Sequence, residues 1–126
     1  MVLDRARSVL GVRFRPQGRD PAFGLDCVGL VAWATGLDAV PADYALRGGD
    51  AHAIAALVDR FARRVDAAEP GDVLLLAAGA AQFHLAVTTG DGVIHADAAL
   101  RRVVERPGPP PWPVLGIWRL NPERID

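Results

Sequence analysis

The only cysteine of the chain lies where a thiol can act as a nucleophile. Cys27 follows Asp26 at the start of a mostly apolar segment, residues 25–35, that predicts a buried helix. With Asp26 as the N-cap, the sulfur lies in the first helical turn, where unpaired N–H groups and the helix dipole favour negative charge. Gly29 leaves room for a second backbone beside this turn. We therefore predict a thiol with a lowered pKa; the alternative is an inert, buried cysteine.

A thiol nucleophile needs a base, and three histidines are available for this role. His52 is expected on the solvated surface of a helix. His84 begins one strand of a predicted hairpin and His95 ends the other, with a turn at residues 90–92. If the two rings share a face of the hairpin, His84 can act as the base and His95 can orient it.

The length of the hairpin turn decides whether the two rings can meet. A four-residue loop, residues 89–92, places His95 opposite Ala86, on a diagonal of roughly 7–8 Å from His84. A two-residue turn separates the rings by about 13 Å, so the site requires the wider loop or a bulge. If the rings instead face apart, three amide side chains remain as candidates for the third member: Gln17, Gln82 and Asn121.

The composition argues against several other classes of protein. All fourteen cationic side chains are arginines, so lysine Schiff-base chemistry is excluded. Ser8 is the only serine and lies in the first predicted helix, so a serine hydrolase is not expected. The net charge of −1 gives no reason to expect a nucleic-acid partner. No apolar run reaches the roughly 18 residues of a membrane span. Cys27 and the histidines lack the spacing of zinc ligands, and residues 90–92 form a turn rather than a phosphate loop. Neither a metal nor a cofactor is expected.

The order of the predicted elements indicates an α+β fold in one domain, residues 1–126. Apolar periodicity predicts helices over residues 2–10, 25–35 and 50–65. Arg60, Arg63 and Arg64 would form the solvated face of the third helix. Apolar runs predict strands over residues 73–76, 85–89, 93–96, 100–105 and 114–120, with a proline-rich loop at 107–113. Helices first and strands afterwards favour helices packed on an antiparallel sheet.

Most of residues 11–96 resembles the NlpC-type cell-wall cysteine peptidases. The family pattern begins with a tyrosine-containing loop and continues with Asp-Cys, a small or apolar residue, and Gly-Leu, which matches residues 26–30. It continues with Pro-Gly-Asp and an apolar strand, which matches residues 70–74. It ends with a histidine, an apolar strand, a glycine-rich turn and Ile-His-Ala, which match residues 84–96. Each motif alone is weak, but their common order and spacing are specific.

The resemblance implies a papain-like fold and a reaction. Cys27 would attack an amide carbonyl of a peptidoglycan stem peptide, typically the bond between γ-D-glutamate and diaminopimelate. His84 would take the thiol proton and return it to the leaving amine, while His95 would orient His84. The backbone N–H of Cys27 would stabilise the oxyanion.

Three further residues are expected to support this site. Asp26 would hold the start of the helix. Phe14 stands where the family usually has a tyrosine, whose hydroxyl is implied to help the oxyanion or the substrate. Gln17 could cover the loss of that hydroxyl. A glutamine at this place also resembles the phage cell-wall peptidases, including those of gene-transfer particles.

That branch implies phage-tail structural proteins as partners. The first twelve residues do not resemble a secretion signal, so we expect a protein made in the cytoplasm and incorporated in the tail of a phage or phage-like particle. Two other functions fit the same residues: a non-catalytic tail plug or adaptor that keeps the fold, and a thiol amidase or acyltransferase for another substrate.

Overall fold

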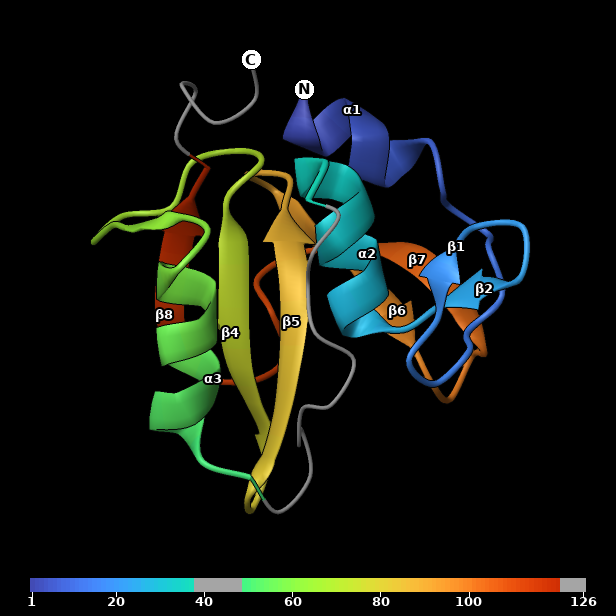
Figure 1. Ribbon diagram of the computed structural model, residues 1–126. Helices are drawn as coiled ribbons and strands as arrows, with labels where there is room; N and C mark the ends of the chain where they lie inside the picture. Colours follow the sequence, from blue (N-terminus) through green and yellow to red (C-terminus); the bar gives the residue numbers. More distant parts are fainter. Residues whose placement is uncertain (38–48, 121–126) are drawn as a thin grey trace.

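The computed structural model describes residues 1–37 and 49–120, and it consists of helices packed over one face of an antiparallel sheet (Figure 1). The three helices are α1 (Val2–Arg7), α2 (Cys27–Thr35) and α3 (Ala51–Asp59). The strands are β1 (Arg19–Asp20), β2 (Gly24–Leu25), β3 (Arg63–Arg64), β4 (Val73–Gly79), β5 (Gln82–Thr88), β6 (Gly92–Asp97), β7 (Arg102–Pro107) and β8 (Val114–Arg119). The α+β architecture predicted from the sequence is confirmed. No helix in the described part of the chain is long and apolar enough to cross a membrane.

Six strands form the main sheet in the order β3-β8-β4-β5-β6-β7. Every pairing in it is antiparallel, and β1 and β2 form a separate small hairpin. The β5–β6 hairpin pairs only near its turn, where Val87 lies opposite Ile94 and Thr88 opposite Val93. The two strands are therefore unpaired with each other where His84 and His95 lie, and the site is built at this opening.

Alternating side chains of the sheet supply two apolar layers. On the helix side, Val73 and Leu75 of β4 pack with Trp118 of β8 and with the start of α2. On the opposite side, Leu74 and Leu76 pack with the loop that joins β7 to β8, which contributes Trp112. The near-continuous burial of β4 follows from this double coverage.

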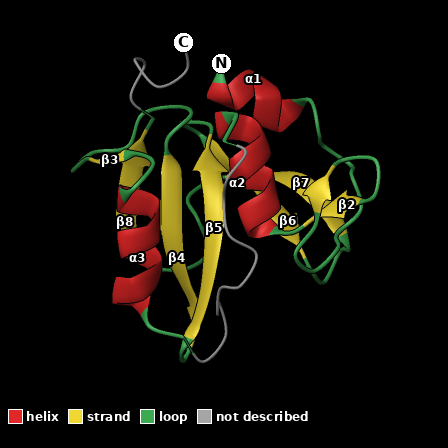
Figure 2. Ribbon diagram, viewed as in Figure 1, coloured by secondary structure: helices red, strands yellow, loops and turns green. Residues whose placement is uncertain are grey.

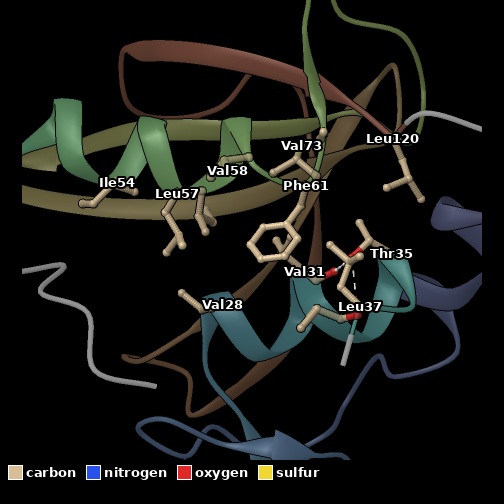
Figure 3. A pocket seen from close by; sticks show the side chains of 13 residues that line it. Val28, Val31, Thr35, Leu37, Ile54, Leu57, Val58, Phe61, Val73 and Leu120 are labelled. Carbon is tan, nitrogen blue, oxygen red and sulfur yellow. Dashed lines mark hydrogen bonds between the residues drawn. The ribbon is translucent and has the colours of Figure 1, made fainter. Parts of the chain in front are cut away.

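An apolar cavity of about 50 Å³ lies between α2 and α3. Figure 3 shows Phe61 reaching from the end of α3 toward Val28 and Val31 of α2. The cavity extends along α2 from Val28 to Thr35, on the helix side of the sheet, so it is distinct from the opening between β5 and β6. Its lining makes it part of the packing that holds α2 in place.

The prediction of a third helix over residues 50–65 is wrong at its C-terminal end. Helix α3 ends at Asp59, and Arg63 and Arg64 form β3, which pairs with β8 at the edge of the sheet (Figure 2). The backbone of Val65 also donates to Ile117 O at 2.9 Å. Edge hydrogen bonds of the sheet thus prevail over helical periodicity, as tertiary contacts often do for short segments. Arg63 and Arg64 are exposed, but on a strand rather than on a helix face.

Other element boundaries shift by a few residues. The second helix begins at Cys27 rather than residue 25, because Leu25 pairs in β2 and Asp26 is the N-cap. The first helix ends at Arg7, and the strand expected over residues 100–105 is β7, Arg102–Pro107. The proline-rich loop accordingly starts at residue 108. The loop expected over residues 37–49 lies mostly outside the described residues.

The close approach expected at Gly29 is present. A Cβ on Gly29 would overlap the carbonyl oxygen of Gly18, so the loop before β1 packs directly on the first turn of α2. The same loop is held to the helix by Asp26, as described below. A side chain at residue 29 would therefore push the loop away from the residue that carries the sulfur.

We expect Gly29→Ala to destabilise the protein by about 1–3 kcal/mol, since the added methyl meets backbone rather than a movable side chain. Helix propensity alone would stabilise this variant by up to about 1 kcal/mol. The sign of the change in urea unfolding free energy therefore tests the packing.

Gly79→Ala is the matched control, because the nearest atoms to its Cβ would all belong to the Gln82 side chain, with the movable Oε1 nearest at 3.2 Å and the others at ordinary contact distances. It should change the unfolding free energy by no more than about 0.5 kcal/mol. A Gly29→Ala variant as stable as the parent would contradict the proposed contact.

Candidate active site

A cleft of about 610 Å³ brings the predicted site residues together. Its walls come from the loop before α2, the start of α2, the facing ends of β5 and β6, and the β7–β8 loop. The predicted residues that line it are Phe14, Gln17, Asp26, Cys27, Gln82, His84 and His95. His52 lies elsewhere, exposed on α3, and Asn121 lies outside the described residues. The part of the chain that the structure describes contains no cluster of three or more His, Cys, Asp or Glu side chains that could hold a metal ion.

The buried carboxylate of Asp26 fixes the position of Cys27. One oxygen, Oδ1, accepts the N–H of Gly29 at 2.8 Å and caps α2. The same atom accepts Arg19 Nη1 at 3.1 Å, and Oδ2 accepts the N–H of Gln17 at 2.8 Å. Asp26 thus ties the preceding loop to the helix start, and it leaves Cys27 as the first helical residue with its thiol lining the cleft.

The structure overturns the prediction of a lowered thiol pKa. Burial raises the pKa of the Cys27 thiol to about 12, and the negative charge of Asp26 adds to this rise. Backbone hydrogen bonds from Leu85, Val28 and Cys27 itself act in the opposite direction but are smaller. The sequence reveals the helix N-terminus, which favours a thiolate, but not the desolvation that prevails over it. The resting sulfur is therefore a neutral thiol.

His84 and His95 contact each other across the opening between β5 and β6. The register follows the four-residue loop, because Thr88 pairs with Val93. His84 Nε2 and His95 Nδ1 lie 2.9 Å apart, with ring centroids separated by 5.1 Å and planes at 87°. Since Nε2 of His84 is engaged by His95, Nδ1 is the nitrogen left to accept a proton from a thiol.

Both imidazoles are neutral at physiological pH. Burial lowers the pKa of His84 to about 4, with a further lowering by His95. Burial also lowers the pKa of His95, against the opposing effect of Asp97. A neutral imidazole has a lone pair available above that pKa, so His84 can act as a base from about pH 5 upward.

Trp112 and Asp97 are among the cleft residues that were not predicted from the sequence. Trp112 meets His84 and His95 edge-on, with centroid distances of 5.6 and 6.0 Å. It contacts the histidine pair from the proline-rich loop. Asp97 lies two residues after His95 on β6. The sequence feature that could have identified Asp97 is the strand periodicity, which places residues 95 and 97 on one face.

Phe14 and Gln17 line the cleft from the loop before α2. The backbone of Phe14 donates to Arg101 O at 2.9 Å, and its ring packs against the apolar core. Gln17 has a positive φ of 58°, and the hydrogen bond from its N–H to Asp26 holds this conformation. Both residues thus lie where they could contact a substrate, but Phe14 brings no hydroxyl to the cleft.

Comparison with known proteins identifies the fold. No protein-family model matches the chain. No curated protein matches it either. Among solved structures, NlpC2 from Trichomonas vaginalis superimposes with a TM-score of 0.71 at 19% identity, over 94% of this chain and 45% of that one. RipB, a peptidoglycan hydrolase from Mycobacterium tuberculosis, superimposes with a TM-score of 0.61 at 23% identity, over 95% of this chain and 63% of RipB. The NlpC/p60 domain of the peptidoglycan hydrolase SagA superimposes with a TM-score of 0.59 at 21% identity, over 84% of this chain and 86% of the SagA domain.

The chain spans less than half the length of the two Trichomonas vaginalis proteins that it resembles, NlpC2 and NlpC1. It covers most of the SagA domain, whose length is similar. The similarity therefore concerns one structural unit of these proteins. The chain has the α+β, papain-like fold of the NlpC/P60 cell-wall peptidases.

Proposed function

We propose that this protein is a cysteine peptidase that hydrolyses an amide bond in the stem peptides of peptidoglycan. The observation that carries the proposal is the meeting of Cys27, at a helix N-terminus, with the hydrogen-bonded His84–His95 pair in one cleft. Structures with the same fold include two named peptidoglycan hydrolases, which supports the choice of substrate.

Acylation starts from a neutral thiol and a neutral imidazole. As Cys27 Sγ attacks the carbonyl carbon, its proton passes to Nδ1 of His84. Proton transfer and attack are coupled, because a buried thiolate formed beforehand is costly. The backbone N–H of Cys27, in the first turn of α2, is our candidate donor to the oxyanion. His95 holds the His84 ring through its Nδ1.

The tetrahedral intermediate then collapses. The C–N bond breaks, the His84 imidazolium protonates the leaving amine, and a thioester to Cys27 remains. Water attacks this thioester with His84 again as the base, which releases the new carboxylate and restores the thiol. We expect Trp112, whose ring contacts both imidazoles, to limit the access of bulk water to the histidine pair during these steps.

The bond that we propose for cleavage joins γ-D-glutamate to diaminopimelate, as the resemblance to the NlpC-type peptidases implies. The cleft volume of about 610 Å³ lies in the range of sites that bind small ligands, which is the size of a short peptide segment. The thiol amidase or acyltransferase alternative shares all of these groups and differs only in the substrate.

Digestion of purified peptidoglycan should release fragments that mass spectrometry assigns to one cleaved stem-peptide bond. Cys27→Ser and His84→Ala should each lower the rate by at least about 10³-fold, because nucleophile and base act as one unit. His95→Ala should retain more activity than His84→Ala, since an orienting residue is partly replaceable. His52→Ala is the matched control, because His52 is an exposed histidine remote from the cleft.

Two outcomes would contradict the proposal. A folded parent protein that releases no fragment from peptidoglycans of different composition would favour the non-catalytic adaptor. Release that persists in Cys27→Ser would remove the sulfur from the chemistry.

Alkylation of Cys27 by iodoacetamide should show the raised pKa directly, since the chain has no other cysteine. The pKa of a free cysteine thiol is about 8.5. We expect the native protein to react at least about tenfold more slowly at pH 8.5 than the urea-unfolded chain, with a rate still rising above pH 10. A rate that is high and constant from pH 5 to pH 8 would instead show a thiolate–imidazolium pair.

We further propose that the peptidase is carried to the wall by the tail of a phage or phage-like particle. This proposal rests on the resemblance around Gln17. Phage-tail proteins should co-purify with the protein from particles, and the protein should be absent from the ordinary secreted fraction. Free export without particle association would contradict this role but leave the peptidase proposal untouched.

A further inference from the structure

The histidine pair leaves one buried nitrogen without a hydrogen bond. His95 is only 2% exposed, and its Nδ1 faces His84. Its other nitrogen, Nε2, has no hydrogen-bond partner in the described part of the chain. A buried polar atom in this state calls for an explanation, because leaving it unpaired is costly. The explanation lies in the charge nearest to it.

That charge is the carboxylate of Asp97, which a local turn holds in place. Asp97 Oδ2 lies 3.9 Å from His95 Nε2. The other oxygen, Oδ1, accepts the N–H groups of Ala99 and Leu100 at 2.9 and 3.0 Å. The turn thus fixes one oxygen and leaves the second near the ring. A distance of 3.9 Å exceeds a hydrogen bond, so the interaction in the resting structure is electrostatic.

We propose that Asp97 is a positioning residue that selects the tautomer of both histidines, an inference that rests on the proposed function. A carboxylate accepts but does not donate, so it favours the proton of His95 on Nε2. His95 Nδ1 then accepts from Nε2–H of His84. The lone pair of His84 is consequently on Nδ1, the nitrogen required to take the proton of Cys27.

The opposite arrangement would disable the base. With the proton of His95 on Nδ1, the 2.9 Å contact requires His84 Nε2 to accept it. The proton of His84 would then lie on Nδ1 and could not be exchanged for that of the thiol. The charge of Asp97 also raises the pKa of both histidines against the effect of burial, whereas Arg106 lowers that of His95. The same charge therefore stabilises the imidazolium formed on acylation.

The substitution Asp97→Asn separates the proposed selection of the histidine tautomers from the role of Asp97 in its local turn. The amide oxygen can still accept Ala99 and Leu100, so the turn is retained. Its NH₂ group then faces His95 Nε2 and donates to it, which favours the opposite tautomer in both rings. Asp20→Asn is the matched control, because Asp20 Oδ1 accepts the N–H of Ala22 at 2.9 Å in a similar turn, exposed and outside the cleft.

Ring ¹⁵N chemical shifts of selectively labelled histidine, measured at pH 7, report the tautomers without any substrate. We expect Nε2–H on both His84 and His95 in the parent and in Asp20→Asn, and Nδ1–H on both in Asp97→Asn. With peptidoglycan, Asp97→Asn should lower kcat at least about 100-fold and leave KM within about threefold, because binding groups are unchanged.

Nδ1–H on His95 in the parent protein would overturn the inference even if the variant failed to fold. Unchanged tautomers in a folded Asp97→Asn would overturn it as well, and would leave Asp97 as a turn residue only. A parent without activity on peptidoglycan would defeat the proposed function, while the chemical shifts would still decide the tautomers.

Discussion

The site depends first on the buried carboxylate of Asp26. Its oxygens accept hydrogen bonds from the first turn of α2, from the backbone of Gln17 and from Arg19, which also compensates its charge. A buried charge with fewer partners would be costly. Removal of this group would release the loop from the helix and with it the close packing of Gly18 on Gly29. The direction of the sulfur is therefore set by an interaction outside the reacting groups.

The second constraint is the balance between burial and the helix N-terminus. Backbone N–H groups around Cys27 favour a thiolate, yet desolvation prevails and keeps the thiol neutral. The same desolvation keeps His84 neutral. Thiol and base are thus matched: neither carries a charge at rest, and charge appears only as the proton moves. Such a pair depends on an imidazole that presents the correct nitrogen more than on an activated sulfur.

The features that the sequence could reveal were those encoded locally. The cap at Asp26 and the small residue at Gly29 each depend on a few neighbouring residues, and the structure has both. For the hairpin the sequence left two turn lengths open, and the structure has the wider loop, with Thr88 opposite Val93. The features that the sequence could not reveal depend on residues far apart along the chain. Arg63 and Arg64 join a sheet because β8 offers an open edge. The pKa of Cys27 depends on how deeply the completed fold buries the sulfur, and Trp112 reaches the histidines only through the path of a loop.

A histidine as the orienting partner of His84 has a consequence for the design of the site. An aspartate in that position would fix the tautomer of His84 by itself, because it can only accept a hydrogen bond. Imidazole can donate or accept with the same atom, so His95 transfers the choice outward to whatever faces its second nitrogen. In a desolvated cleft this arrangement avoids a buried charge next to a neutral base. The carboxylate that makes the choice, Asp97, then lies nearer to solvent, where its charge is less costly.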